Sequence, residues 1–197
     1  TDWPDKLDTI RWVYGEMVRK ISAGELVRIL VRHKAEEKLA KSYLKRAACD
    51  LKRVEFVIHP TNPGWTRDSG PIFVRRKVRS SGFSRSDRLK AGLRTETAIV
   101  HFHFNAWAKY DDWQKDRKVP ETAARLLKKR LFNAEFNGRD FVVEGGGIEV
   151  NGRGTLLTTE ECYQHPKIQV RNPGLTKAQY DATFKRYLGV KNVLRLL

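Results

Sequence analysis

Cysteine is scarce in this chain of 197 residues, which holds only Cys49 and Cys162 and no Cys-x-x-Cys pair. Two thiols are too few for a disulfide framework, and the missing pair argues against a structural zinc site. No apolar run approaches the roughly 18 residues of a membrane helix. The charged start, TDWPDKLDTI, also lacks the apolar segment of a signal peptide. We therefore expect a cytoplasmic protein that needs no metal and has no membrane partner.

Acidic residues are also few, with 23 Asp and Glu against 39 Lys and Arg and a formal charge of +16. Such an excess is typical of proteins with polyanionic partners. The densest stretch, RRKVRSSGFSRSDRLKAGLR from Arg75 to Arg94, holds a single aromatic residue, Phe83. It therefore lacks the stacking platforms that bind single-stranded bases. We favour a solvated hairpin arm or linker, and keep a basic nucleic-acid-binding module as the alternative from another functional class.

Hydrophobic periodicity predicts alternating helices and strands, which is typical of the α/β class. The order of elements indicates a repeated unit of two strands, a helix and a strand. No low-complexity linker divides the chain, so we expect a single domain over 1–197. The expected helices are 4–22, 34–48, 120–132 and 176–189, and the expected strands are 25–31, 54–58, 71–78, 97–104, 140–144 and 190–197, with a hairpin at 147–159.

The stretch GWTRDSGPIF places Trp65, Arg67 and Asp68 at the mouth of an expected strand. A carboxylate beside an indole suits a planar cation, because the carboxylate accepts two N–H groups of a guanidinium while the ring stacks on its face. A charged turn, in which Asp68 binds nearby backbone N–H groups, is the equally weighted alternative.

The stretch FVVEGGG places Glu144 after three apolar residues and before three glycines. A glutamate at the end of a buried strand is costly unless it is paired. Glycines let another group approach the backbone closely. We favour a functional carboxylate over a hairpin with a charged tip.

Two further groups of polar residues are weaker candidates. His101 and His103 share one face of a strand, but no third metal ligand is visible at a useful spacing, so we expect half-buried histidines. Cys162 and His165 lie in a polar loop without an oxyanion cradle, and we expect Cys162 to be structural. The glycines of GGGIEVNGRG lack the strand–turn–helix context of a dinucleotide site.

Four motifs together resemble the agmatine deiminase family, also described as Porphyromonas-type peptidyl-arginine deiminases. They are WTRDSGPIFV (65–74), FHFNAWAKY (102–110), VEGGGIEVNGRGTLLTTEEC (143–162) and VRNPG (170–174). The resemblance implies a pentein fold, which is a fivefold propeller of ββαβ units. It also implies hydrolysis of agmatine to N-carbamoylputrescine and ammonia, as in putrescine biosynthesis, without a cofactor.

The same resemblance implies roles for individual residues. Asp68 corresponds to a guanidinium-binding carboxylate, and Glu144 to a catalytic carboxylate that pairs with substrate or with a histidine. Trp65 and Trp107 correspond to walls of the substrate pocket. In the family, a cysteine thiolate attacks the guanidinium carbon, ammonia leaves, and water then cleaves the amidino-thioether, with a histidine as acid and base.

The chain departs from the family pattern at its end. The family's Gly-His-x-Asp segment and its cysteine nucleophile should follow the last strand, whereas the sequence stops at VLRLL. We therefore expect a partial pentein, truncated before its C-terminal repeats, with no nucleophile of its own and no activity alone. Arginine or peptidyl-arginine deimination is the alternative within the class. Open strand edges also lead us to expect a homo-oligomer.

Overall fold

The computed structural model describes residues 4–62, 64–79 and 93–197, which form two compact units, Thr1–Gly64 and Trp65–Leu197. The expectation of a single domain over 1–197 stays a prediction. Most of the basic stretch lies outside the described residues, so its role as an arm stays a prediction too. Within the described ranges, no helix is long and apolar enough to cross a membrane.

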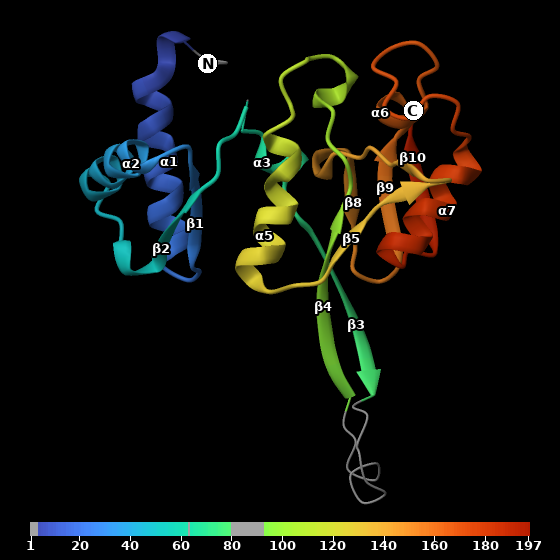
Figure 1. Cartoon of the computed structure of the whole chain (residues 1–197), viewed down its shortest axis with the longest axis horizontal. Coiled ribbons are helices and arrows are strands. Elements are labelled where there is room, and N and C mark those ends of the chain that lie inside the picture. Colours follow the sequence, from blue (N-terminus) through green and yellow to red (C-terminus); the bar gives the residue numbers. More distant parts are fainter. Residues whose placement is uncertain (1–3, 63, 80–92) are drawn as a thin grey trace, which may run out of the picture. The chain divides into compact units, whose positions relative to one another are not determined.

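The first unit is a β-α-β arrangement preceded by a helix (Figure 1). Its two strands pair in parallel, with Val27 opposite Val54, and a helix connects them. The first helix contacts the second where Gly15 meets Ala47. The elements are η1 (Pro4–Lys6), α1 (Leu7–Ser22), β1 (Val27–Val31), α2 (Lys34–Arg46), η2 (Leu51–Arg53) and β2 (Val54–Ile58).

The second unit contains two ββαβ repeats, as the order of expected elements predicted. In each repeat the first two strands are antiparallel, and the strand after the helix joins in parallel. Figure 1 shows β3 and β4 of the first repeat as a long pair. The first repeat comprises β3 (Ile72–Arg79), β4 (Leu93–His101), α5 (Val119–Leu127) and β5 (Leu131–Asn133), and the second β8 (Ile148–Val150), β9 (Thr155–Thr159), α7 (Lys177–Leu188) and β10 (Asn192–Leu196).

Short elements connect the two repeats and carry the candidate residues. The stretch 140–144 was expected to be a regular strand, but beyond β7 it makes only one bridge, from Val142 to His103. Its backbone is nevertheless well bonded, since His103 N–H donates to Phe141 and Val143 N–H donates to His103. These elements are α3 (Thr66–Ser69), η3 (Ala106–Ala108), η4 (Asp116–Lys118), β6 (Glu135–Phe136), β7 (Arg139–Asp140), η5 (Gly145–Gly147) and α6 (Glu160–Gln164).

Local sequence signals explain several boundaries. Thr176 and Gln179 form a capping box at the start of α7, and Gly189 ends that helix in the left-handed conformation. The hairpin expected around Asn151-Gly152 joins β8 to β9. The helix expected over 120–132 was too long, because Lys128 adopts a left-handed backbone that ends α5 and frees Leu131–Asn133 to form β5.

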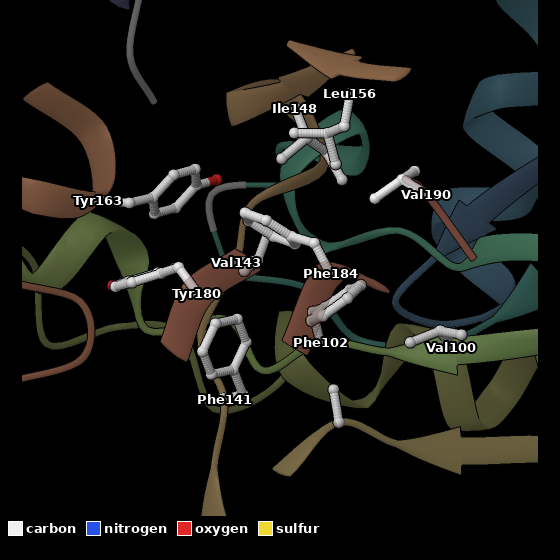
Figure 2. Packing of buried hydrophobic residues seen from close by; sticks show 11 residues of the cluster. Val100, Phe102, Phe141, Val143, Ile148, Leu156, Tyr163, Tyr180, Phe184 and Val190 are labelled. Atoms are coloured by element: carbon white, nitrogen blue, oxygen red, sulfur yellow. The ribbon is translucent and has the colours of Figure 1, made fainter. Parts of the chain in front are cut away.

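One hydrophobic cluster holds the two repeats together (Figure 2). It joins the ends of β4 and β5 to the interior of the second repeat. Tyr180 and Phe184 project from α7 onto Phe141, with ring centroids 5.1 and 6.1 Å away. Glu144 directly follows the buried Val143, so this cluster fixes the backbone that carries the candidate carboxylate. The cluster comprises Val100, Phe102, Ala134, Phe141, Val143, Ile148, Leu156, Tyr163, Tyr180, Phe184 and Val190.

Candidate functional site

The Asp68 turn lies directly against the triple glycine. Oδ1 of Asp68, on the one-turn helix α3, accepts a hydrogen bond from the backbone N–H of Gly146 at 3.0 Å. A Cβ atom on Gly146 would lie 2.1 Å from this oxygen, and one on Gly145 would lie 2.2 Å from the carbonyl oxygen of Arg67. Both distances are far below van der Waals contact. The glycines are therefore needed for close approach, and two motifs 78 residues apart in sequence form one site.

An unusual turn presents Trp107 to Asp68. Ala106, Trp107 and Ala108 have φ angles of 49°, 61° and 52°. A left-handed backbone costs a residue with a side chain about 1–2 kcal/mol, so three in succession mark a strained segment. The indole N–H of Trp107 donates to the Asp68 carboxylate, and its ring meets Trp65 edge-on at 6.1 Å. The strain thus holds an aromatic wall beside a carboxylate.

Glu144 is fully buried and bound to an arginine of the same unit. Its carboxylate oxygen Oε1 accepts a hydrogen bond from Nε of Arg171 at 3.1 Å, and the two side chains are only 2% and 5% exposed. Nη1 of Arg171 donates in turn to the carbonyl oxygen of Gln169 at 2.8 Å. Glu144 is therefore not an unpaired carboxylate in this chain.

Neighbouring side chains fix the backbone around this ion pair. The side chain of Asn172 accepts from the N–H of Val142 and donates to its carbonyl, both at 2.8 Å, and also donates to the hydroxyl of Tyr180. This amide binds Val142 as a neighbouring strand would. On the other side, the hydroxyl of the buried Tyr163 donates to the carbonyl oxygen of Glu144 at 3.1 Å.

The electrostatics of the site favour an added cation. Burial raises the pKa of Asp68 and of Glu144, whereas the charge of Arg171 lowers both pKa values. Arg67 also lowers the pKa of Asp68, but its guanidinium lies 3.4 Å from the Glu149 carboxylate. Arg67 and Glu149 are both exposed and offset each other, which leaves Asp68, Glu144 and Arg171 as the buried and half-buried charges. These two carboxylates and one guanidinium carry a net charge of −1, which favours one further cation.

Three of the four predicted residues are in contact, and the fourth, Glu144, lies two residues before the glycine that bonds Asp68. Asp68 contacts Trp107, which packs on Trp65, and it reaches the Glu144 segment through Gly146. Sequence reasoning missed Arg171 as the partner of Glu144. The requirement that a buried glutamate be paired indicated that a cation existed. Nothing local indicated which of the many basic residues it would be, because Arg171 lies 27 residues away.

The two histidines form a buried pair beside Asp140. The rings of His101 and His103 stack with centroids 4.6 Å apart, and both are buried, more deeply than expected. Nε2 of His103 lies 3.0 Å from a carboxylate oxygen of Asp140. Burial lowers the pKa of both histidines, that of His103 to about 4. Within the described ranges, no cluster of three His, Cys, Asp or Glu side chains could hold a metal ion.

Both cysteines have structural surroundings. The thiol of Cys49, in the first unit, donates to the carbonyl oxygen of Gly15 at 3.3 Å, and burial raises its pKa. A raised pKa lowers the thiolate fraction and hence the nucleophilicity. Cys162, on α6, packs against the hydrophobic cluster of the second unit, and its structural role stays a prediction.

A cavity of about 750 Å³ borders the site but does not contain its carboxylates. Arg67 and Gly145 lie in its wall with Phe73 and Glu149, whereas neither Asp68 nor Glu144 lines it.

The chain resembles known deiminases over its full length. Residues 1–197 match the family model described as Porphyromonas-type peptidyl-arginine deiminase. The agmatine deiminase of Stutzerimonas stutzeri is 32% identical over 99% of this chain and 46% of its own length. A variant of the C. jejuni agmatine deiminase, solved with substrate bound, is 26% identical over 99% of this chain and 49% of its own, with a TM-score of 0.73.

The fold agrees with this similarity. The Enterococcus faecalis agmatine deiminase, at 23% identity, matches 98% of this chain with a TM-score of 0.74. The α/β architecture with ββαβ repeats is that of the pentein fold, as the motifs implied. This chain spans about half the length of the relatives it matches. It belongs to the Porphyromonas-type peptidyl-arginine deiminase family.

Proposed function

We propose that this chain forms the guanidinium-binding part of a deiminase site and that its ligand is agmatine. Asp68 accepts the N–H groups of the guanidinium, and Trp65 and Trp107 form walls beside its plane. Glu144 lies next to the reacting carbon as the catalytic carboxylate. The observation that carries the proposal is the net charge of −1 on the buried and half-buried group formed by Asp68, Glu144 and Arg171, beside two indoles.

The reaction proposed for the whole protein is hydrolysis of agmatine to N-carbamoylputrescine and ammonia in the cytoplasm, which would serve putrescine biosynthesis. The names of the relatives support this choice of substrate over arginine or peptidyl-arginine. Neither Cys49 nor Cys162 has the surroundings of a nucleophile. We therefore propose that the 197-residue chain binds agmatine but does not hydrolyse it.

Calorimetric titration of the chain with agmatine tests the binding role. Replacing Asp68 with asparagine (D68N) removes a charge-assisted hydrogen bond, which contributes about 1.5–3 kcal/mol, so affinity should fall about 10- to 150-fold. The matched control is D112N, which removes one charge from an exposed position in the same unit. Equal affinity of wild type and D68N would contradict the proposal, as would binding of putrescine, which has no guanidinium, as tightly as agmatine.

Three ligands distinguish the alternatives within the family. Agmatine, L-arginine and an N-acetylated arginine amide share the guanidinium but differ in what surrounds the α-carbon. Tighter binding of either arginine compound than of agmatine would favour arginine or peptidyl-arginine deimination. Release of ammonia from agmatine by the purified chain would contradict the assignment of both cysteines to structural roles. Self-association stays a prediction, to be tested by sedimentation.

A further inference from the structure

The buried Arg171–Glu144 pair suggests how the two carboxylates of the site divide their work. We propose that Arg171 is a positioning residue: it holds the Glu144 carboxylate in a fixed orientation, so that Asp68 is left to receive the ligand guanidinium. The part of the inference that concerns the ligand rests on the proposed function, whereas the part that concerns the ion pair does not. Arg171 belongs to the VRNPG segment, residues 170–174.

The geometry of the pair supports a positioning role. The bond from Nε of Arg171 to Oε1 of Glu144 is 3.1 Å long and is shielded from solvent on both sides. Nη1 of Arg171 is bound by the carbonyl of Gln169, a residue with a left-handed backbone (φ 48°). The guanidinium is therefore anchored by its own segment and cannot swing away without breaking that second bond.

The segment that carries Arg171 is itself hydrogen-bonded to the stretch that carries Glu144. Asn172 makes two hydrogen bonds to the backbone of Val142, two residues before Glu144. The distance between the backbone segments of Arg171 and Glu144 is thus set by hydrogen bonds other than the ion pair. An arginine placed in this way orients a carboxylate instead of merely neutralising it.

The charge of Arg171 also separates the behaviour of the two acids. Burial raises the pKa of Glu144, and the charge and hydrogen bond of Arg171 oppose that rise. For Asp68, Arg171 is the last of the opposing influences, after the N–H of Gly146, the indole of Trp107 and Arg67. Glu144 is therefore the acid with a direct internal cation, while Asp68 has mainly neutral donors, which leave its charge available to a ligand.

Carboxyl-carbon NMR on the full chain tests the inference, with the Glu144 signal assigned by its loss in E144Q. In R171M the titration midpoint of Glu144 should rise by about one pH unit or more, because the charge of Arg171, the largest influence that opposes burial, is then gone. R171K should restore part of this shift. The matched control is R195M, which removes another buried arginine of the same unit, the partner of Asp181 on α7. Unchanged titration in R171M, or an equal shift in R195M, would overturn the inference.

A second measurement covers the case in which R171M does not fold. Removing one partner of a buried pair leaves an uncompensated charge, whereas removing both does not. We therefore expect E144Q/R171M to recover at least about half of the stability lost in R171M. A double variant no more stable than R171M would contradict the pairing.

Agmatine titrations of the same samples separate the two proposals. If Arg171 only positions Glu144, R171M should weaken agmatine binding less than D68N does. Equal losses in the two variants would refute the division of work between the carboxylates. If wild type binds no guanidinium compound while the Glu144 midpoint still shifts in R171M, the proposed function fails and the positioning of Glu144 stands.

Discussion

Replacing Gly146 with alanine should displace Asp68 from its position in the site. The new Cβ would lie 2.1 Å from Oδ1 of Asp68, more than 1 Å inside ordinary contact, so the carboxylate must move. Its 3.0 Å hydrogen bond from the Gly146 N–H would then break. A hydrogen bond to a charged group contributes about 1.5–3 kcal/mol, and residual crowding adds about 1 kcal/mol or more. We expect the free energy of unfolding to fall by about 2–4 kcal/mol.

Urea unfolding followed by near-ultraviolet circular dichroism measures this loss, and agmatine titration measures its effect on the site. The matched control is G24A, because a Cβ on Gly24 would have no atom within 4 Å. Its stability should stay within about 0.5 kcal/mol of wild type. Agmatine affinity should fall at least about tenfold in G146A, since the carboxylate no longer lies beside the indoles. If G146A matched G24A in both stability and binding, the argument from close approach would be refuted.

Three further changes test other parts of the second unit. The pKa of His103 is lowered from 6.5 to about 4, chiefly by burial and then by the charge of His101, so the unfolded chain binds more protons between these values. The free energy of unfolding should therefore fall by roughly 3 kcal/mol as the pH drops through that interval, and in H103N it should depend less on pH. Urea unfolding at several pH values measures this dependence, and an equally steep dependence in H103N would contradict the reasoning. N172A should lower the free energy of unfolding by about 2–4 kcal/mol, because both backbone groups of Val142 lose their partner, and its hydrogen exchange should accelerate; unchanged protection would contradict this. A108G relieves a left-handed backbone at an exposed position and should raise the thermal midpoint slightly, whereas a marked decrease would show that the turn is not strained.

Much of the fold could be predicted from local signals. The Asn151-Gly152 turn and the Thr176 capping box mark their elements because backbone geometry there depends on nearby residues. Local patterns fail where the deciding contact is distant. In α1, Val13 and Met17 are apolar residues four positions apart, the spacing of one helix face, yet they are exposed, and Gly15 and Val18 are buried instead. Periodicity identifies the helix, but the packing partner decides which face is covered.

In the candidate site, too, local sequence patterns identify some residues, and distant contacts decide the rest. Asp68 and Glu144 stand out because carboxylates beside strands and glycines are unusual in sequence. Their connection through Gly146 depends on a close approach that only the folded chain shows. The left-handed turn at Trp107 could not be predicted, because no glycine or asparagine occupies its three positions. Arg171 looks like one of many surface cations until its burial against Glu144 is seen.

The stretch before Glu144 is hydrogen-bonded on both of its edges, and this has a consequence for the kinetics of ligand binding. Phe141 and Val143 are bonded to His103 on one edge, and Val142 is bonded to Asn172 on the other. Little conformational entropy therefore remains to be lost when a ligand arrives, so this part of the site is preorganised. Association should then be governed by diffusion and by the positive surface that a cation must cross, and less by rearrangement of the chain.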